Sequence, residues 1–306
     1  MKISMIGAGR VGSTTLYTLL LEGGITEMVI VDVDKPRAEG EALDLRHALA
    51  LTQNCKITAG DYDATEGSDM VIITAGIPRK PGDTRLDLLK RNTELMGGIL
   101  EGVLKYNKDT FLFMVSNPVD VLTFQALKTS GFPANKVFGL GTVLDTNRFR
   151  ALLGERLGVS PDQVVVYMMG EHGDSMVPVI SHATVAGIPL QQFPGFSNEM
   201  LEEVITATRF GGAEVIKRKG GTFYSVAPSI ASVVRAVKND QKKVLPISSL
   251  IDGWYKDLKG MTISLPCVVG KNGREKVLDP LFSESEAAQF ENSFKVLKEA
   301  AASVGL

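Results

Sequence analysis

A glycine-rich turn near the N-terminus places the strongest constraint on the fold of this chain. Residues 2–7 (KISMIG) predict a strand, and Gly7-Ala8-Gly9-Arg10-Val11-Gly12 follows at once and leads into a helical pattern. In a strand–turn–helix of this kind, the first glycine permits the tight turn, the second lets the backbone approach a pyrophosphate, and the third lets helix and strand pack closely. The turn therefore predicts a nucleotide site in which the helix N-terminus faces the phosphates.

An acidic residue at the end of the second predicted strand (28–33) indicates which nucleotide is bound. Asp32 lies 20 residues after Gly12, where a carboxylate accepts hydrogen bonds from the adenosine ribose and repels a 2′-phosphate. Asp34 is the neighbour most easily confused with it. We therefore predict NAD rather than NADP. The glycine turn alone does not define the chemistry, because methyltransferases have a similar turn. The alternative of a Rossmann turn that binds no nucleotide also stays open.

Short apolar runs alternate with amphipathic segments along the first half of the chain. The runs cover residues 2–7, 28–33, 70–76, 111–117 and 137–141, and residues 86–106 have helical spacing. Runs that are apolar on both faces predict buried parallel strands covered by helices. In the second half, 163–170 and 262–270 predict strands, and 202–221, 222–238 (bent at Pro228) and 285–304 predict helices. We predict an α/β fold with a Rossmann-type, doubly wound parallel sheet over residues 1–142 and an α+β substrate and catalytic domain over residues 143–306.

Composition and charge exclude several classes of protein. The 306 residues are 44% hydrophobic and 22% charged with a net charge of -2, so no strong field favours nucleic acid or an acidic membrane surface. The apolar run 16–21 is too short for a signal peptide, and nothing approaches the roughly 20 apolar residues of a membrane span. Cys55 and Cys267 lie outside any CxxC spacing. We expect a cytoplasmic protein without disulfides and without nucleic-acid or membrane partners.

One of the three histidines lies in a turn suited to chemistry. His172 is in the glycine-bracketed segment GEHGD (170–174), directly after a predicted strand. One ring nitrogen can there face a ligand while the other meets a carboxylate, as in a general base. His47 and His182 are interpreted as structural, or for His47 as an interface residue. Glu171, His172 and Asp174 are adjacent turn residues that rarely converge on one ion, so we predict no metal site.

Two further segments supply polar side chains whose interpretation stays open. Asp145 and Arg148 share one face of a predicted helix. However, Thr142 and Asp145 also match a capping box, and Arg148 can be a solvated helix charge. Asn117 ends a strand before Pro118, at the edge where open parallel sheets bind ligands, but it can equally stabilise the turn.

Six ordered segments resemble the lactate/malate dehydrogenase superfamily. GAGRVG, VDVD, TAGIPRKPGDTRLDL, SNPVDV, LDTNRFR and GEHGDS match its motifs in order and spacing. The similarity continues through KGGTFYS and GKNGREK to the C-terminal helix and so spans nearly the whole chain. The resemblance implies an NAD-dependent oxidoreductase that acts on 2-hydroxy and 2-oxo acids. It also implies a homo-oligomer, with a tetramer favoured over a dimer.

The resemblance implies a role for each polar side chain. His172 would exchange a proton with the substrate oxygen while hydride moves between C2 and the nicotinamide, and Asp145 would orient and charge its ring. Arg148 would clamp the C1 carboxylate, and Arg85 would polarise the reacting carbonyl. The other residues with an implied binding role are Asn117 and Thr222 for the substrate, and Thr74, Ala75, Gly76, Asn92, Val115 and Asn117 for the cofactor.

A loop position six residues before Arg85 separates members of this superfamily by substrate. It is usually glutamine in lactate-type enzymes and arginine in malate-type enzymes, and here it is Arg79. A buried cation facing the substrate would pair with the second carboxylate of malate or oxaloacetate and would stay unpaired with lactate or pyruvate. Thr222 aligns instead with a threonine typical of lactate-type relatives. The prediction is a lactate-like malate dehydrogenase of the tricarboxylic acid cycle; L-lactate dehydrogenase and a catalytically silent NAD-binding protein are the alternatives.

Overall fold

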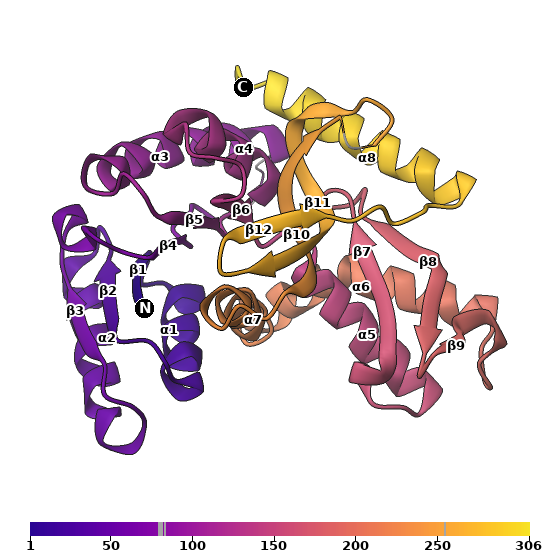
Figure 1. Ribbon diagram of the computed structural model, residues 1–306, viewed down its shortest axis with the longest axis horizontal. Coiled ribbons are helices and arrows are strands. Elements are labelled where there is room, and N and C mark those ends of the chain that lie inside the picture. The colour runs from indigo at the N-terminus through magenta and orange to yellow at the C-terminus, as the bar shows by residue number, and fades with distance from the viewer. Residues whose placement is uncertain (79–81, 83, 254) are drawn as a thin grey trace.

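The computed structural model describes residues 1–78, 82, 84–253 and 255–306. Its described strands are β1 (Lys2–Ile6), β2 (Glu27–Val31), β3 (Lys56–Ala59), β4 (Met70–Ile73), β5 (Phe111–Met114), β6 (Val137–Gly139), β7 (Val164–Met169), β8 (Val177–Val185), β9 (Ile188–Pro189), β10 (Lys243–Asp252), β11 (Lys259–Gly270) and β12 (Gly273–Val277). The described α-helices are α1 (Arg10–Glu22), α2 (Lys35–His47), α3 (Arg85–Tyr106), α4 (Val119–Ser130), α5 (Val143–Leu157), α6 (Asn198–Lys219), α7 (Val226–Lys238) and α8 (Glu284–Ala302). Figure 1 shows how these elements are arranged.

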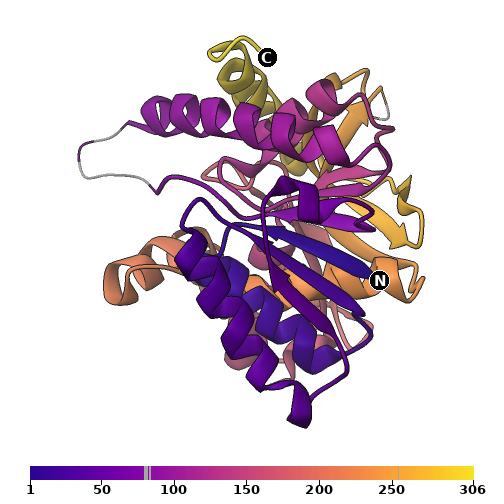
Figure 2. The same cartoon turned by 90° about the vertical axis from the view of Figure 1, so that its left-hand side faces the viewer.

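The large sheet has the order β12-β11-β10-β6-β5-β4-β1-β2-β3, and its strands from β6 to β3 are parallel. Helices cover both of its faces in this region (Figures 1 and 2). On β4, Met70 and Ile72 belong to the hydrophobic cluster on the side of α1 and α7, whereas Val71 and Ile73 belong to the one on the side of α3 and α4. Burial on both faces explains the continuous apolar runs. The predicted α/β fold is confirmed.

Three strands from the second half of the chain extend this sheet. β10 pairs antiparallel with β6, and β11 and β12 continue the antiparallel arrangement, so the sheet is mixed rather than purely parallel. The sequence predicted β11 but not β10. Pro246, Ser248 and Ser249 interrupt the apolar pattern of β10, although all three lie in a continuous strand.

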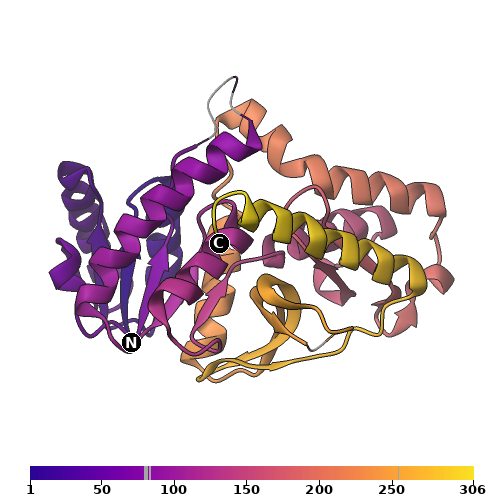
Figure 3. The ribbon, with the colours of Figure 1, turned by 90° about the horizontal axis from the view of Figure 1, so that it is seen from above.

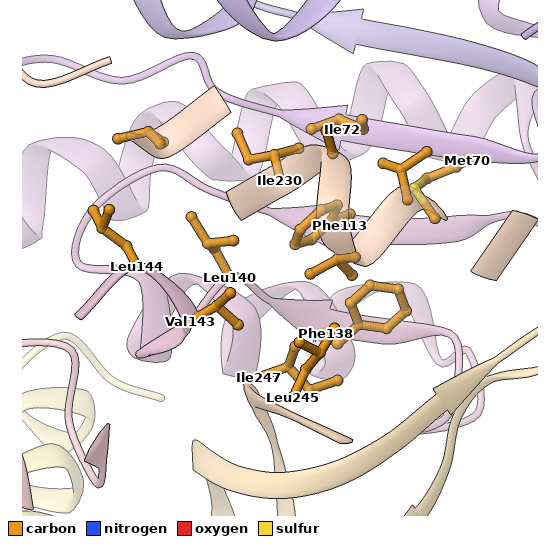
Figure 4. Close-up of a cluster of buried hydrophobic side chains, with 14 of the residues drawn as sticks. Met70, Ile72, Phe113, Phe138, Leu140, Val143, Leu144, Ile230, Leu245 and Ile247 are labelled. Atoms are coloured by element: carbon orange, nitrogen blue, oxygen red, sulfur yellow. The ribbon is translucent and has the colours of Figure 1, made fainter. Parts of the chain in front are cut away.

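Side chains from both halves of the chain share one buried cluster (Figure 4). Phe113 and Phe138 from neighbouring parallel strands have ring centroids 5.3 Å apart. Ile230 of α7 and Ile247 of β10 are fully buried in the same cluster. This shared cluster packs the two halves of the chain, and the elements that surround the site, against one another.

Helix α7 begins at Val226, four residues later than predicted. Gly220, with φ of +78°, ends α6, and residues 220–225 form a loop. Pro228 therefore lies in the first turn of α7, where its missing N–H breaks no helical hydrogen bond, and the predicted bend does not arise.

Helices α5 and α6 pack against the small antiparallel sheet of β7, β8 and β9. The last helix, α8, lies over β8 and β11 (Figure 3). Among the helices of the described residues, none combines the length and apolarity that crossing a membrane requires.

Candidate active site

The carboxyl ends of the parallel strands bring the predicted cofactor residues to one edge of the sheet. Gly7 follows β1, Asp32 follows β2, Thr74 follows β4 and Val115 follows β5. Strands β1 and β4 are neighbours whose connections leave in opposite directions, which is where ligands of such sheets bind. A cavity of about 660 Å³ lies at this edge. Of the predicted cofactor residues, it is lined by Gly7, Gly9, Asp32, Thr74, Ala75 and Gly76.

The three glycines of the turn have different steric requirements. A Cβ at Gly12 would lie 2.0 Å from the carbonyl oxygen of Gly7, and a Cβ at Gly7, where φ is +111°, would lie 2.7 Å from the amide nitrogen of Ala75. At Gly9, a Cβ would meet no heavy atom of the described chain within 4 Å. Gly7 and Gly12 are thus needed for packing, whereas Gly9 leaves room for an anion at the N-terminus of α1.

Asp32 is fixed at the glycine turn by two hydrogen bonds. Its carboxylate accepts from the amide of Ala8 at 2.6 Å and from the amide of Asp34 at 2.9 Å. Asp34 instead caps α2 by accepting from the amide of Arg37 at 3.2 Å. Of the two acids, Asp32 is therefore the one that lines the cavity with acceptor capacity left for a ribose.

The cavity walls include residues that the sequence did not predict. Leu95 and Ile99 lie four residues apart on α3 and form an apolar wall with Tyr62. At the rim, Lys35 Nζ and Asp61 Oδ2 are 2.7 Å apart. An apolar wall of this kind suits a flat aromatic ring such as adenine. The only sequence signal was the helical spacing of Leu95 and Ile99, which fits a hydrophobic core equally well.

Asn92 is buried, although the sequence predicted that it contacts the cofactor. Its side-chain nitrogen donates to the carbonyl oxygens of Ile77 at 3.1 Å and Asn117 at 2.8 Å, and its oxygen accepts from the amide of Ile77 at 2.8 Å. Asn92 thereby ties the loop after β4 to the loop after β5. Its contact with the cofactor stays a prediction.

His172, Asp145 and Arg148 meet between the turn after β7 and the first turns of α5. Nδ1 of His172 lies 2.6 Å from Oδ2 of Asp145, and Nη1 of Arg148 donates to Oδ1 of Asp145 at 3.1 Å. Asp145 is 1% exposed. The capping-box interpretation of Thr142 is wrong, because its hydroxyl donates to the carbonyl oxygen of Met168 instead.

The buried carboxylate sets the protonation state of His172. Burial alone would lower the pKa of His172, but the charge and hydrogen bond of Asp145 outweigh burial and raise the pKa to about 9. Burial would likewise raise the pKa of Asp145, but His172 and Arg148 outweigh it and the pKa is lowered. At neutral pH the imidazole is therefore protonated. Since Nδ1 faces Asp145, Nε2 is the nitrogen left to exchange a proton with a ligand.

Asp120 of α4 holds the backbone of the turn that contains His172. Its Oδ2 accepts from the amide of His172 at 2.8 Å, and its Oδ1 accepts from the hydroxyl of Ser248 at 2.6 Å. Burial raises the pKa of Asp120 to about 6 in spite of these hydrogen bonds. Asp120 was not among the residues predicted from the sequence. The available signal was a carboxylate in the largely apolar segment VDVLTF.

Arg85 and Asn117 line a second cavity beside His172, of about 350 Å³. Arg85 is the first residue of α3 and forms an ion pair with Asp174, which belongs to the same turn as His172. Both partners of this ion pair are exposed. Arg79, the predicted determinant of the substrate, lies outside the described residues.

Helix α6 makes room for Arg148 with a glycine. Arg148 is 17% exposed and also donates to the carbonyl oxygen of Thr208 at 3.1 Å, so the interpretation as a solvated charge is wrong. A Cβ at Gly211 would lie 2.8 Å from Cδ of Arg148, whereas one at Gly212 would lie 3.8 Å from Nη2. The glycine pair inside a helical pattern was an unused signal. Thr222 is half-buried in the loop between α6 and α7, and its contact with substrate stays a prediction.

Comparison with known families covers both halves of the chain. Residues 1–139 match a model described as lactate/malate dehydrogenase, NAD binding domain. Residues 142–304 match lactate/malate dehydrogenase, alpha/beta C-terminal domain.

Several named proteins and solved structures are similar to this chain. L-lactate dehydrogenase of Clostridium botulinum (strain Hall) is 43% identical over 302 residues, covering 97% of this chain and 95% of the relative. L-lactate dehydrogenase of Acetivibrio thermocellus is 43% identical over 303 residues with the same coverage. Among solved structures, a lactate dehydrogenase from a Medee basin deep-sea metagenome library has a TM-score of 0.96 at 34% identity, covering 100% of this chain and 99% of that one. The minor L-lactate dehydrogenase of Enterococcus mundtii, in a ligands-bound form, has a TM-score of 0.95 at 35% identity, covering 100% and 98%. These names favour lactate rather than the predicted malate.

Proposed function

Because the chain belongs to the lactate/malate dehydrogenase family and has its NAD-binding domain, we propose that it interconverts 2-hydroxy and 2-oxo acids at His172. The observation that carries this proposal is the 2.6 Å contact between His172 and the buried Asp145, with Arg148 beside it. A catalytically silent NAD-binding protein would not need a charged imidazole and a guanidinium held at one carboxylate.

His172 exchanges the proton of the reaction. Its protonated ring, held by Asp145, offers Nε2–H to the carbonyl oxygen of an oxo acid, and in the opposite direction the neutral ring accepts the hydroxyl proton. Bound NAD supplies the hydride donor or acceptor at its nicotinamide ring. Since the pKa of His172 is about 9, reduction of the oxo acid starts from the prevailing protonation state at neutral pH.

Two arginines bind the remaining polar atoms of the substrate. Arg148 is fixed through Nη1 by Asp145 and Thr208, which leaves the rest of its planar fork for two parallel hydrogen bonds to the C1 carboxylate. Arg85 leaves its ion pair with Asp174 and then polarises the reacting carbonyl by binding the substrate oxygen. Breaking that ion pair costs little free energy, because an exposed ion pair contributes about 1 kcal/mol or less to stability.

For the preferred substrate we propose the malate and oxaloacetate pair, on the strength of Arg79. This residue lies outside the described part of the chain, so the support comes from its place in the sequence, six residues before Arg85. A cation at that position pairs with the second carboxylate of a dicarboxylate. The methyl group of lactate or pyruvate leaves it without a partner.

The second candidate is the L-lactate and pyruvate pair. The names of the relatives favour it directly. The resemblance of the KGGTFYS segment, with Thr222, to lactate-type enzymes favours it too. At 43% identity, however, two relatives can differ at the single loop position that selects the substrate.

Steady-state oxidation of NADH with oxaloacetate and with pyruvate separates these candidates. We expect a higher kcat/KM with oxaloacetate, and expect Arg79→Gln to shift the ratio toward pyruvate by about a hundredfold or more. Lys80→Gln removes the neighbouring cation and is the matched control, with an unchanged ratio expected. If the unaltered protein turns over pyruvate faster than oxaloacetate, the L-lactate and pyruvate pair is the substrate pair instead. No turnover of any 2-oxo acid, with NADH or NADPH, would refute the enzyme function itself.

A further inference from the structure

We infer that Ser293 of the C-terminal helix α8 is a positioning residue for the catalytic turn, so that the placement of His172 depends on the last helix of the chain. This role presupposes the proposed function, because it concerns the same proton-transfer site. Ser293 is completely buried and lies far from the turn in sequence. Its hydroxyl nevertheless contacts the turn on both sides of His172.

The hydroxyl of Ser293 takes part in a closed ring of hydrogen bonds. The amide of Glu171 donates to Oγ of Ser293 at 2.7 Å, and Oγ of Ser175 lies 3.0 Å from the same atom. The hydroxyl of Ser175 donates in turn to Oε2 of Glu171 at 2.5 Å. Glu171 and Ser175 flank His172, so this ring closes the turn around the catalytic residue.

Simple chemistry fixes the direction of every proton in this ring. Ser175 donates its single hydroxyl proton to Oε2 of Glu171. Ser293 therefore donates to Ser175 and accepts from the amide of Glu171. Each hydroxyl both donates and accepts, an arrangement in which neighbouring hydrogen bonds polarise and strengthen one another. Removing the hydroxyl of Ser293 opens the ring at two places.

The turn packs closely against the hydroxyl of Ser293. A Cβ at Gly170 would lie 2.7 Å from Oγ of Ser293, so the backbone of the turn lies directly against α8. Without the hydroxyl, the amide of Glu171 would lose its acceptor in a partly buried place, which carries a desolvation penalty. The turn relieves that penalty by moving, and His172 moves with it. Its 2.6 Å contact with Asp145 is then lengthened.

The same helix also borders the cavity beside Arg85. Leu297 follows Ser293 by four residues, is buried on the same side of α8, and lines that cavity with Val296 and Ala300. A single helix thus supports the turn of His172 through a hydroxyl and the wall next to Arg85 through apolar side chains.

The test is Ser293→Ala, with Ser68→Ala as the matched control. Ser68 is also buried, and its hydroxyl lies 2.6 Å from that of Ser4. This pair belongs to the NAD-binding half and is far from the turn of His172. For Ser293→Ala we expect kcat for oxo-acid reduction to fall about tenfold, with the dissociation constant of NADH unchanged. For Ser68→Ala we expect a similar loss of melting temperature and an unchanged kcat.

A second readout follows His172 directly in the protein without cofactor. An NMR titration of the imidazole, assigned with His172→Asn, should show a midpoint near 9 in the unaltered protein. Ser293→Ala should lower this midpoint because the contact with Asp145 loosens, whereas Ser68→Ala should leave it in place. A purely structural serine would change the melting temperature without changing the midpoint.

The outcomes are distinguishable. If Ser293→Ala keeps kcat and the His172 midpoint, as Ser68→Ala does, the positioning role is refuted while the proposed function stands. If the unaltered protein reduces no 2-oxo acid, the proposed function fails, and the positioning role with it. If Ser293→Ala does not fold, Ser175→Ala is the test, because it removes the hydroxyl that accepts the proton of Ser293. For Ser175→Ala, a fall in kcat smaller than that expected for Ser293→Ala, with unchanged NADH binding, supports the role. An unchanged kcat of Ser175→Ala refutes it.

Discussion

Replacing Asp145 by asparagine isolates the charge that acts on His172. An amide has nearly the size of the carboxylate and can still accept one hydrogen bond, but it carries no charge. The buried position and the 2.6 Å contact with Nδ1 mean that this charge is poorly screened by solvent. The substitution therefore changes the electrostatics of the imidazole more than its packing.

The size of the effect follows from the pKa of His172. The carboxylate holds this pKa at about 9 against an ordinary value of 6.5, although burial acts in the opposite direction. The difference corresponds to about 3 kcal/mol in favour of the protonated ring. Without the charge, the effect of burial is left uncompensated and the pKa falls to 6.5 or below. At pH 7.5 the protonated fraction then drops from nearly complete to about a tenth at most.

The assay is the pH dependence of kcat/KM for reduction of the oxo acid. The unaltered enzyme should keep its activity up to a midpoint near 9. Asp145→Asn should lose activity above about 6.5 and be about tenfold or more slower at pH 7.5. Glu286→Gln is the control, since Glu286 is a buried carboxylate that accepts hydrogen bonds from the backbone amides of Ile180 and Ser181. A midpoint that stays near 9 in Asp145→Asn would refute the electrostatic reasoning.

The same pKa also predicts how stability depends on pH. The folded value of about 9 lies above the unfolded value of 6.5, so the folded state binds the proton more tightly. The contribution is complete below about 6.5 and is lost as the pH rises through 9, which lowers the free energy of unfolding by about 3 kcal/mol. Chemical denaturation across this range should show the loss in the unaltered protein and not in Asp145→Asn.

Two glycine pairs give further predictions with internal controls. Gly211→Ala places a methyl group 2.8 Å from Cδ of Arg148 and should raise KM for the oxo acid about tenfold at unchanged NADH affinity. Gly212→Ala, with its nearest contact at 3.8 Å, should resemble the unaltered enzyme, and equal KM values for the two variants would contradict the clamp. Gly12→Ala meets a backbone oxygen at 2.0 Å and should lower melting temperature and NADH affinity together. Gly9→Ala meets no described atom within 4 Å and should lower NADH affinity alone, as measured by fluorescence titration; unchanged affinity would mean that no pyrophosphate approaches this turn.

The parallel part of the sheet was predictable because its determinants are local. Strands such as β4 are buried on both faces, so Met70 to Ile73 form an unbroken apolar run that few other elements produce. The glycine turn and Asp32 were predictable for a similar reason, since strand, turn, helix and acid follow one another within the first 32 residues.

The remaining parts depend on contacts between distant segments. β10 contains a proline and two serines and is identifiable only from its pairing with β6 and β11. Asp120 and Ser293 hold the turn of His172 from helices α4 and α8, and no local pattern distinguishes either residue from an ordinary polar residue of a helix. The predicted tetramer stays a prediction, because an interface between chains is set by surfaces that a single chain does not define.

The extension of the large sheet by β10, β11 and β12 has a consequence for how the molecule unfolds. A chain cut after residue 142 would expose β6 as a bare edge strand, with its apolar side chains and unpaired backbone groups open to other chains. The NAD-binding half therefore relies on the second half to cover its edge. Heating should melt both halves in one cooperative transition, and the isolated first half should aggregate rather than persist as a monomer.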